Sequence, residues 1–438
     1  MTMVNGFTAD DAARLPARER ELIERRERAL GPAYRLFYER PLHIVKGDGV
    51  WLYDADGKRY LDAYNNVASI GHCNAQVVDA ICAQARTLNT HTRYLHESIL
   101  DYSEKLLATF PAYLNHAMFT CTGSEANDLA LRIAKQYTGG TGVIVTQLAY
   151  HGITDLVAAV SPSLGSGVEP GHFVRTVRAP DAYRLGAENV ARVFADDVRA
   201  AIADMRANGI KPAAILFDGI FASDGVFADP AGFAKEAIAL AKREGLLYIA
   251  DEVQSGLGRT GSHLWGFQRH GVEPDIVTMG KPMGNGHPIA AAVMRAEVVE
   301  EFGRTARYFN TFGGNPVSCA AANAVLDFIQ HERLLDNCAT VGSYLKSGLE
   351  DLAKRHAGIG DVRGAGLFLG VEFASDRSAK TADPDTTRRV VNGLRERGVL
   401  ISSAGPQANI LKIRPQLIFQ REHADLFIDT LDGVLRDL

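Results

Sequence analysis

Short apolar runs alternate with segments of helical spacing from about residue 116 to residue 294. The runs have the length and composition of buried strands, and they lie at 117–120, 142–146, 213–217, 246–250, 276–279 and 289–294. Helical spacing separates several of them, most clearly at 124–137 and 233–244. Strands that alternate with helices predict an α/β fold with a mostly parallel sheet between two layers of helices.

Elements of a different kind precede this region. Segment 11–30 has the charge and the apolar spacing of a surface helix. Two strands are predicted at 49–54 and 58–62, on either side of an Asp-Ala-Asp-Gly turn. Helical spacing then returns at 76–88 and 98–110.

The pattern changes again after about residue 318. Predicted helices and apolar segments are mixed there, at 319–329, 345–356, 366–373, 386–397 and 410–413. This mixture indicates a separate, smaller α+β domain. We therefore predict a large central domain over 65–318. The N-terminal segment 1–64 and the C-terminal part 319–438 are expected to form the small domain.

Length and composition narrow the function classes. The chain has 438 residues and is 46% hydrophobic, which suffices for a large core and exceeds one compact unit. A formal net charge of −5 gives no reason to expect nucleic acid or a membrane surface as a partner. The five cysteines form no C-x-x-C pair, which fits a reduced, cytoplasmic compartment. Residues 1–20 are too polar for a secretory signal, and no apolar run approaches the roughly 20 residues that span a bilayer.

Candidate chemistry gathers at two strand ends in the stretch 246–281. One apolar run ends on Asp251, and the next leads directly to Lys281. Ligands of open α/β sheets bind beyond the carboxyl ends of the strands, so both side chains fall where chemistry is expected. A carboxylate beside a ring nitrogen and a lysine that can form a Schiff base are the groups that pyridoxal phosphate (PLP) requires.

Other segments at strand ends have two explanations each. Gly123 ends a turn and Ser124 opens the predicted helix at 124–137, whose N-terminus could bind phosphate or could simply be capped. Tyr150 could stack on a flat heterocycle or could pack at the rim of the core. Both segments would lie at the same edge of the sheet as Asp251 and Lys281.

Two further patterns argue against other cofactors. Histidines at 72, 91 and 96 lack the spacing and the partners of a metal site, so no metal is expected. Glycines at 364, 366 and 370 have the spacing G-x-G-x-x-x-G, which differs from the dinucleotide fingerprint. No preceding strand or following helix is evident, and we interpret these glycines as sites of close backbone packing in the small domain.

Taken together, five motifs resemble those of the class III (ω-amino) aminotransferases, which are fold-type I PLP enzymes. They are Gly-Ser-Glu-Ala-Asn at 123–127, Tyr-His-Gly at 150–152, Asp-Glu-Val-Gln at 251–254 with Gly-Arg-Thr-Gly at 258–261, Lys281, and Thr-Phe-Gly-Gly-Asn-Pro at 311–316. The resemblance extends from residue 49 to about residue 419. It implies the fold-type I architecture, PLP as cofactor, and a homodimer with shared active sites.

The resemblance implies a role for each residue around the cofactor ring. Lys281 would bind PLP covalently, and Asp251 would keep the ring nitrogen protonated. Val253 and Tyr150 would pack on the two faces of the ring. Gln254 would form a hydrogen bond with the ring hydroxyl.

The remaining cofactor contacts come from three other segments. His151 belongs to the same cofactor-binding motif as its neighbour Tyr150. Gly123 and Ser124 would hold the cofactor phosphate. The partner subunit's Thr311 would reach that phosphate across the dimer.

Two positions depart from the usual pattern of this family. A glutamate is usual at the end of the strand before the Asp251 strand, where this chain has Asp218. An arginine usually opens an Arg-x-x-Pro-Pro-Leu motif, and here the motif begins with Lys412. Lysine offers a point charge in place of a planar fork for a carboxylate. Ordinary amino-acid transamination is therefore not implied.

Further segments resemble one branch of the family, the ethanolamine-phosphate and phosphohydroxylysine phospho-lyases. They lie at 65–68, 92–96, 277–288 and 315–319, and that branch also tends to have lysine at the position of Lys412. The resemblance implies elimination of phosphate from a small phosphorylated amine such as O-phosphoethanolamine. Candidate substrate contacts are Asn66, Arg93, Asp218, Lys412 and Arg414.

Two alternatives remain open. One is an ω-aminotransferase that transfers an amine to a keto acid such as pyruvate or 2-oxoglutarate. The other is a catalytically silent binding protein with the same fold, against which the presence of Lys281 and Asp251 argues.

Overall fold

A seven-stranded sheet forms the centre of the protein. The computed structural model describes residues 6–12 and 14–438, so residues 1–5 and 13 of the expected N-terminal segment lie outside it. In sheet order the strands are β4 (His116–Thr120), β10 (Ala290–Met294), β9 (Ile276–Met279), β8 (Leu247–Asp251), β7 (Pro212–Asp218), β5 (Gly142–Thr146) and β6 (Val174–Val177). Strand β10 is antiparallel to β4 and β9, and the other neighbours are parallel. The predicted, mostly parallel sheet is confirmed.

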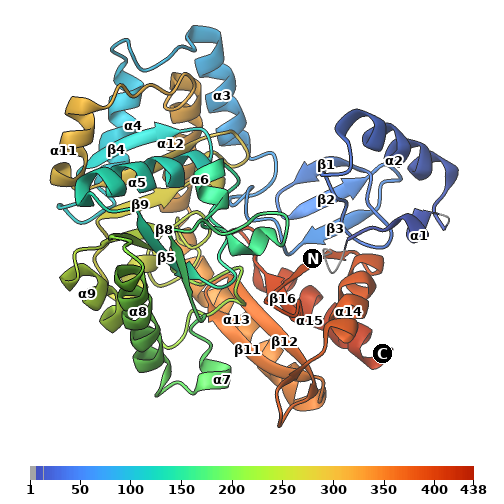
Figure 1. The fold of residues 1–438 in the computed structure, drawn as a ribbon. Coiled ribbons are helices and arrows are strands. Elements are labelled where there is room, and N and C mark those ends of the chain that lie inside the picture. The colour runs from blue at the N-terminus through green and yellow to red at the C-terminus, as the bar shows by residue number, and fades with distance from the viewer. Residues whose placement is uncertain (1–5, 13) are drawn as a thin grey trace.

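Helices cover both faces of this sheet. Helix α5 (Gly123–Thr138) contacts β7, β8, β9 and β10 on one face, whereas α8 (Val190–Ala207) and α9 (Lys235–Arg243) contact the strands from the other face (Figure 1). The other helices of this part are α3 (Ala75–Thr87), α4 (Glu97–Leu107), α6 (Asp155–Ala158), α7 (Ala182–Leu185), α10 (Gly266–His270), α11 (Ala296–Thr305) and α12 (Pro316–His331). The inner strands β10, β9, β8, β7 and β5 are buried almost throughout, as expected for a sheet between two helical layers, whereas the edge strands β4 and β6 are partly exposed.

Two smaller sheets are built from the ends of the chain. The first contains β1 (Ile44–Asp48), β2 (Trp51–Asp54), β3 (Arg59–Asp62) and β14 (Val399–Leu400), so the two ends of the chain meet in it (Figure 1). The second contains β11 (Ile359–Ala365), β12 (Phe368–Asp376), β16 (Ile410–Ile413) and β15 (Ser402–Ala404), with β13 (Thr381–Ala382) paired to β12. The predicted union of N- and C-terminal parts is therefore confirmed. The domain boundaries near residues 64 and 318 stay predictions.

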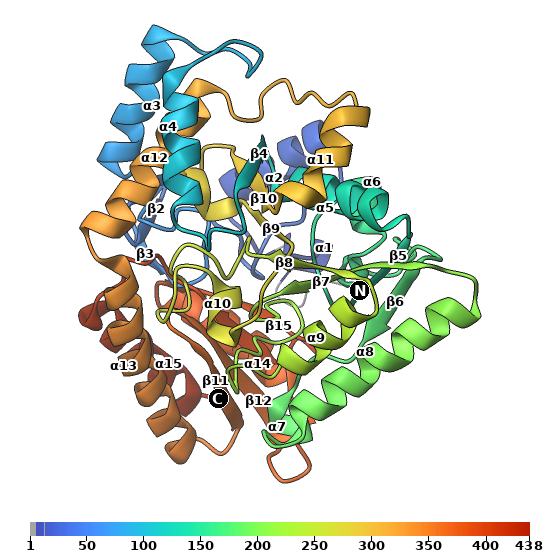
Figure 2. The same cartoon turned by 90° about the vertical axis from the view of Figure 1, so that its left-hand side faces the viewer.

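Three C-terminal helices pack around these sheets. They are α13 (Leu334–Arg355), α14 (Pro384–Glu396) and α15 (Arg421–Arg436). Helices α13 and α15 contact each other, and α13 continues the chain directly after α12 (Figure 2). Both α12 and α13 are longer than predicted, because buried positions continue beyond the segments that showed clear apolar spacing.

Several element boundaries differ from the predictions. The helix expected over 11–30 is two helices, α1 (Ala9–Ala12) and α2 (Ala17–Leu30). Pro16 separates them, because a residue that precedes proline is disfavoured in the helical region. Helix α2 contains no buried residue, so its surface position is confirmed. Helix α8 and strand β6 were not predicted.

The glycine-rich segment at 364–370 joins two antiparallel strands, β11 and β12. Contrary to the prediction, a strand does precede it, but no helix follows. A Cβ atom at Gly366 would lie 2.5 Å from the carbonyl oxygen of Arg259. The glycines therefore permit close backbone approach, as predicted. No helix within the described part of the chain has the length and hydrophobicity needed to cross a membrane.

Candidate active site

Three ionisable side chains meet where β7, β8 and β9 end. Asp218 is the last residue of β7, and Asp251 is the last residue of β8. The sheet register pairs Asp218 with Asp251, and Asp251 with Thr278 of β9. Lys281 follows shortly after β9. Because parallel strands end at one edge of a sheet, the structure places both predicted catalytic residues, Asp251 and Lys281, at the same edge.

The Asp251 carboxylate is buried and held by three donors. His151 Nδ1 lies 2.7 Å from Oδ2, and Asn127 Nδ2 donates to the same oxygen at 3.1 Å. The backbone N–H of Val253 donates to Oδ1 at 3.0 Å. These contacts hold the Asp251 side chain in one orientation at the end of β8.

Asn127 belongs to this network, and its role was not predicted from the sequence. Its Nδ2 atom also donates to the carbonyl oxygen of His151 at 2.8 Å, and its Oδ1 accepts from Thr278 Oγ1 at 2.6 Å. Asn127 is fully buried on α5, among apolar residues that face the sheet. Buried polar groups are nearly always hydrogen-bonded. An asparagine on the apolar face of a helix was therefore the signal that could have identified it.

The N-terminus of α5 faces this network. Thr122 caps the helix and forms a capping box with Glu125, so the helix begins before Ser124, which had been expected to open it. The hydroxyl of Ser124 accepts from the backbone N–H of Ile153 at 3.1 Å. A helix N-terminus attracts anions through its free N–H groups and its dipole. The predicted phosphate residues, Gly123 and Ser124, lie at this terminus.

Two glycines keep the region beside this terminus closely packed. A Cβ atom at Gly123 would lie 3.0 Å from Val253 Cγ2, and one at Gly152 would lie 2.4 Å from Ser124 Oγ. Gly152 has φ +145°, a conformation that disfavours other residues. The backbones of three segments therefore approach one another around the predicted cofactor residues.

The amine of Lys281 lies near the face of Tyr150, with Nζ 5.8 Å from the ring centroid. Burial lowers the pKa of Lys281 to about 8, and the positive charge of Arg414 acts in the same direction. The carboxylates of Asp251 and Asp218 oppose this shift. A lysine with a depressed pKa is suited to act as a nucleophile and as a base.

These residues fit PLP. A buried Asp251 carboxylate suits a protonated ring nitrogen, and the helix N-terminus at Gly123 suits a phosphate. His151 Nε2 is buried and has no hydrogen-bond partner among the described residues, which leaves a polar atom available beside the same site. The Lys281 amine completes the set with a nucleophile of lowered pKa.

We expect the rate of covalent PLP uptake to depend on the ionisation of Lys281. Only the neutral amine attacks an aldehyde, so the rate for the cofactor-free protein should rise about tenfold per pH unit below pH ~8 and then level off. Stopped-flow absorbance over about pH 6 to pH 10 measures this rate. A rate that climbs steadily to pH ~10 would show that the amine keeps its ordinary pKa.

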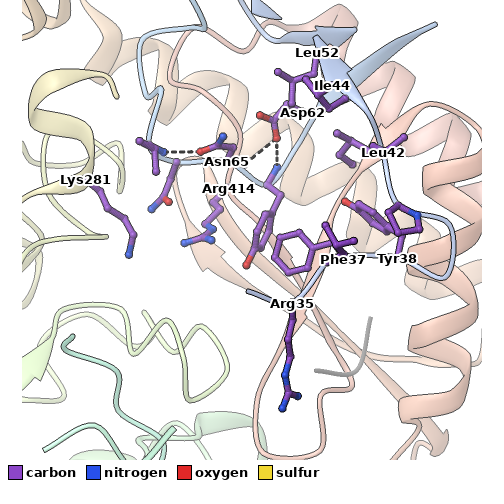
Figure 3. Close-up of a pocket in the computed structure, with 16 residues that line it drawn as sticks. Arg35, Phe37, Tyr38, Leu42, Ile44, Leu52, Asp62, Asn65, Lys281 and Arg414 are labelled. Carbon is purple, nitrogen blue, oxygen red and sulfur yellow. Dashed lines mark hydrogen bonds between the residues drawn. The ribbon is translucent and has the colours of Figure 1, made fainter. Parts of the chain in front are cut away.

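A pocket of about 450 Å³ lies next to Lys281. Asn66, Arg414 and Lys281 line one part of it, together with Asp62, Tyr64 and Asn65 (Figure 3). The N-terminal segment lines the rest through residues such as Phe37 and Leu42. Two of the predicted substrate contacts, Asn66 and Arg414, therefore share a cavity with the predicted catalytic lysine.

Arg414 is held from two sides. Its guanidinium lies over the ring of Tyr64, 4.3 Å from the centroid, and its Nη1 donates to the side-chain oxygen of Gln254. The Nε atom is buried without a partner among the residues described. The family resemblance implies that Gln254 binds the ring hydroxyl, and the contact of Gln254 with Arg414 was not predicted. The contact joins the predicted cofactor and substrate sides of the site.

Lys412 is buried on β16, and its charge interacts with that of the partly buried Asp218. Burial lowers the pKa of Lys412 well below its usual value, and Arg414 and Lys281 add to this effect. Burial and the charge of Asp251 raise the pKa of Asp218. The backbone N–H groups of Ile220 and Ala222, and the charge of Lys412, favour the ionised carboxylate. Lys412 and Asp218 therefore support each other's charged forms.

Asp224 is a buried carboxyl whose charge also acts on Lys412. It accepts from Thr146 Oγ1 at 2.7 Å and from the backbone N–H of Leu148 at 3.1 Å. Burial raises the pKa of Asp224 to about 6. This residue was not predicted, because both partners lie at or just after the end of β5, 78 and 76 positions away in the sequence.

Two predicted site residues lie on exposed loops. Arg93 stacks on Phe309, with its guanidinium carbon 3.8 Å from the ring centroid. Thr311 is exposed on the loop that follows Phe309. Within a single chain neither residue lines the described pocket beside Lys281. A contribution of the partner subunit's Thr311 stays a prediction.

The chain is similar to known PLP enzymes. Residues 37–435 match the family model "Aminotransferase class-III". An alanine–glyoxylate aminotransferase 2-like protein of Drosophila melanogaster is 39% identical, over 93% of this chain and 85% of the relative. Ethanolamine-phosphate phospho-lyase homolog 1 of Caenorhabditis elegans is 35% identical, over 99% of this chain and 98% of the relative.

Solved structures of a phospholyase and of an aminotransferase are also similar to this chain. A phospholyase from Arthrobacter in complex with phosphoethanolamine has a TM-score of 0.92 and 46% identity, covering 95% of this chain and 100% of that one. An aminotransferase from Bacillus anthracis has a TM-score of 0.86 and 28% identity, and the match covers 97% of this chain and 100% of that one. The chain therefore belongs to the class III aminotransferase family and has the fold of the fold-type I PLP enzymes.

Proposed function

We propose that this protein is a PLP-dependent phospho-lyase that converts O-phosphoethanolamine and water into acetaldehyde, ammonia and phosphate. The observation that carries the proposal is the similarity over nearly the whole chain to a phospholyase solved with phosphoethanolamine. The pocket agrees with it, because Arg414 offers a cation and Asn66 an amide beside Lys281. We further propose a homodimer in the cytoplasm.

The cofactor would supply a covalent link to the substrate amine and an electron sink when bound. Asp251, fixed by His151 and Asn127, would hold the proton on the ring nitrogen. Lys281 would take the proton from the substrate carbon that bears the amine, a role for which its lowered pKa suits it. The electron pair of the C–H bond would form a carbon–carbon double bond as the neighbouring C–O bond breaks and its own pair leaves with the phosphate. Water would then hydrolyse the released enamine to acetaldehyde and ammonia.

The cations of the pocket favour a substrate that contains phosphate. The Arg414 guanidinium can donate two parallel hydrogen bonds to phosphate oxygens. Position 412, where arginine is usual in the family motif, has a lysine that is buried beside Asp218. The usual fork for a substrate carboxylate is therefore absent from that position.

A second candidate function is amine transfer to a keto acid. Several relatives are aminotransferases by name, including the Drosophila protein. Lys281 and Asp251 would serve this reaction as well, since both reactions begin with removal of the same proton. Phosphate release from phosphoethanolamine, measured beside amine transfer to pyruvate and 2-oxoglutarate, separates the two functions. Fast transfer without phosphate release would overturn the phospho-lyase proposal.

The variant Arg414→Ala should bind the phosphorylated substrate poorly. Loss of hydrogen bonds to a charged group costs about 1.5–3 kcal/mol, so the KM for phosphoethanolamine should rise about 10- to 100-fold. The variant Arg414→Lys keeps the positive charge but loses the planar fork, so its KM should lie between those of Arg414→Ala and wild type. Steady-state kinetics and the inhibition constant of inorganic phosphate measure the effect.

Arg35→Ala is the matched control for this prediction. Arg35 lines the same pocket from the N-terminal segment, and its guanidinium points away from Arg414 (Figure 3). Its removal should change the KM by less than about threefold, in line with an exposed charge. An unchanged KM in Arg414→Ala would show that the phosphate binds elsewhere.

A further inference from the structure

The segment that contains Arg414 is attached to the turn that contains Asn66. The backbone N–H of Arg414 donates to the carbonyl oxygen of Ala63 at 2.9 Å. Further along, the N–H of Leu417 donates to the carbonyl oxygen of Ser69 at 2.6 Å. The two segments therefore run together along one side of the pocket.

One side chain strengthens this attachment between the two backbone contacts. Gln416 is fully buried, and its Nε2 donates to Asp62 Oδ2 at 3.1 Å and to the carbonyl oxygen of Asn65 at 3.4 Å. Gln416 Oε1 is buried without a partner among the residues described. Burial of an amide is unfavourable unless it is hydrogen-bonded. The orientation of Gln416 is thus set by the carboxylate of Asp62, which can only accept.

Asp62 in turn shapes the turn that leads to Asn66. Its Oδ1 accepts from the backbone N–H groups of Tyr64 at 3.2 Å and Asn65 at 2.9 Å (Figure 3). Its Oδ2 also lies 2.8 Å from His72 Nε2. A carboxylate that accepts from N–H groups two and three residues ahead holds a turn in a single conformation.

We propose that Gln416 is a positioning residue, which holds the Asn65–Asn66 turn against Arg414 and thereby determines how tightly the enzyme binds a phosphate-bearing substrate. The inference rests on the proposed function, since Asn66 and Arg414 are its proposed substrate contacts.

Gln416→Met tests the proposal, because methionine has nearly the same length and no amide. We expect the KM for phosphoethanolamine and the dissociation constant of inorganic phosphate to rise about tenfold, as for a lost hydrogen bond to a charged group. The kcat and the PLP absorbance should stay within about twofold, because Lys281 and Asp251 are untouched. Gln330→Met, at an exposed position on α12, is the matched control and should behave as wild type.

A double-mutant cycle with Asp62→Asn separates positioning from a general loss of packing. If Gln416 acts through Asp62, the effects of the two substitutions on phosphate affinity are strongly non-additive. Independent, additive effects would overturn the proposal. So would equal phosphate affinity in Gln416→Met and wild type, measured by calorimetry on the holoenzyme.

Failure of the inference about Gln416 and failure of the proposed function give different experimental results. That function fails if wild type releases no phosphate from phosphoethanolamine. The inference about Gln416 fails if its replacement leaves the binding of inorganic phosphate unchanged. The first result requires turnover, and the second does not.

Discussion

Replacing Lys281 with alanine should lower phosphate release by about 10⁴-fold or more. The variant loses both the amine that binds PLP and the base that takes the substrate proton, and a positioned base alone contributes 10²–10⁴-fold. Lys281 lies directly after β9, beside Tyr150 and the pocket, with a pKa lowered to about 8. Phosphate release and the absorbance of covalently bound PLP measure the two losses separately.

The matched control for this variant is Lys211→Ala. Lys211 is exposed and lies at the opposite end of the strands, immediately before β7. Its replacement should leave both readouts within about twofold of wild type, as for most surface substitutions. Persistence of the covalent absorbance band in Lys281→Ala would show that another amine binds the cofactor.

The variant Asp251→Asn should have the second largest effect, a fall in kcat of about 10²–10³-fold. The side chain keeps its shape but loses the negative charge that would stabilise a protonated ring nitrogen, and removing one such electrostatic group costs that much. His151 and Asn127 would then face an uncharged partner. Steady-state kinetics, with the PLP content of the variant determined in parallel, check the result.

Thr278→Val is the matched control for Asp251→Asn. It removes only the hydroxyl that donates to Asn127, one step away from the carboxylate, and a neutral hydrogen bond contributes about 1 kcal/mol. The loss in kcat should therefore stay below about tenfold. A fall as large as that of Asp251→Asn would show that packing, and not the carboxylate charge, limits the rate.

The strand ends were predictable because local sequence determines them. Runs such as 246–250 and 276–279 are buried on both faces, and the first polar residues after them mark the edge of the sheet. The placement of Asp251 and Lys281 at this edge follows from that pattern, and the other motifs at strand ends marked them as candidates for chemistry. Family resemblance then added Gly123, Ser124 and Tyr150, which lie at the same edge.

Contacts between distant segments were not predictable from such patterns. Gln416 and Asp62 are 354 positions apart, and Asp224 bonds to Thr146 across 78 positions. Only the folded chain shows that these polar residues are buried together. Asn127 was predictable in part: its polar side chain interrupts an apolar helix face, which marks it as buried, but its partners are visible only in the folded chain.

The predicted substrate contacts also show that a residue's surroundings cannot be read from local sequence. Arg93 and Arg414 were both predicted on the strength of charge and resemblance, yet only Arg414 lies in the pocket beside Lys281. Charge is visible in a sequence, but the direction in which a side chain points depends on its neighbours. For Arg414 those neighbours are Tyr64 and Gln254.

The stoichiometry of the reaction without a keto acid tests the central claim most directly. Holoenzyme is incubated with a large excess of O-phosphoethanolamine, and phosphate, acetaldehyde and ammonia are quantified together. A phospho-lyase needs no amine acceptor, so all three products should accumulate in equal amounts through many turnovers. Cessation after a single amine transfer per active site, with no phosphate released and activity restored by pyruvate or 2-oxoglutarate, would contradict the phospho-lyase proposal and identify an aminotransferase.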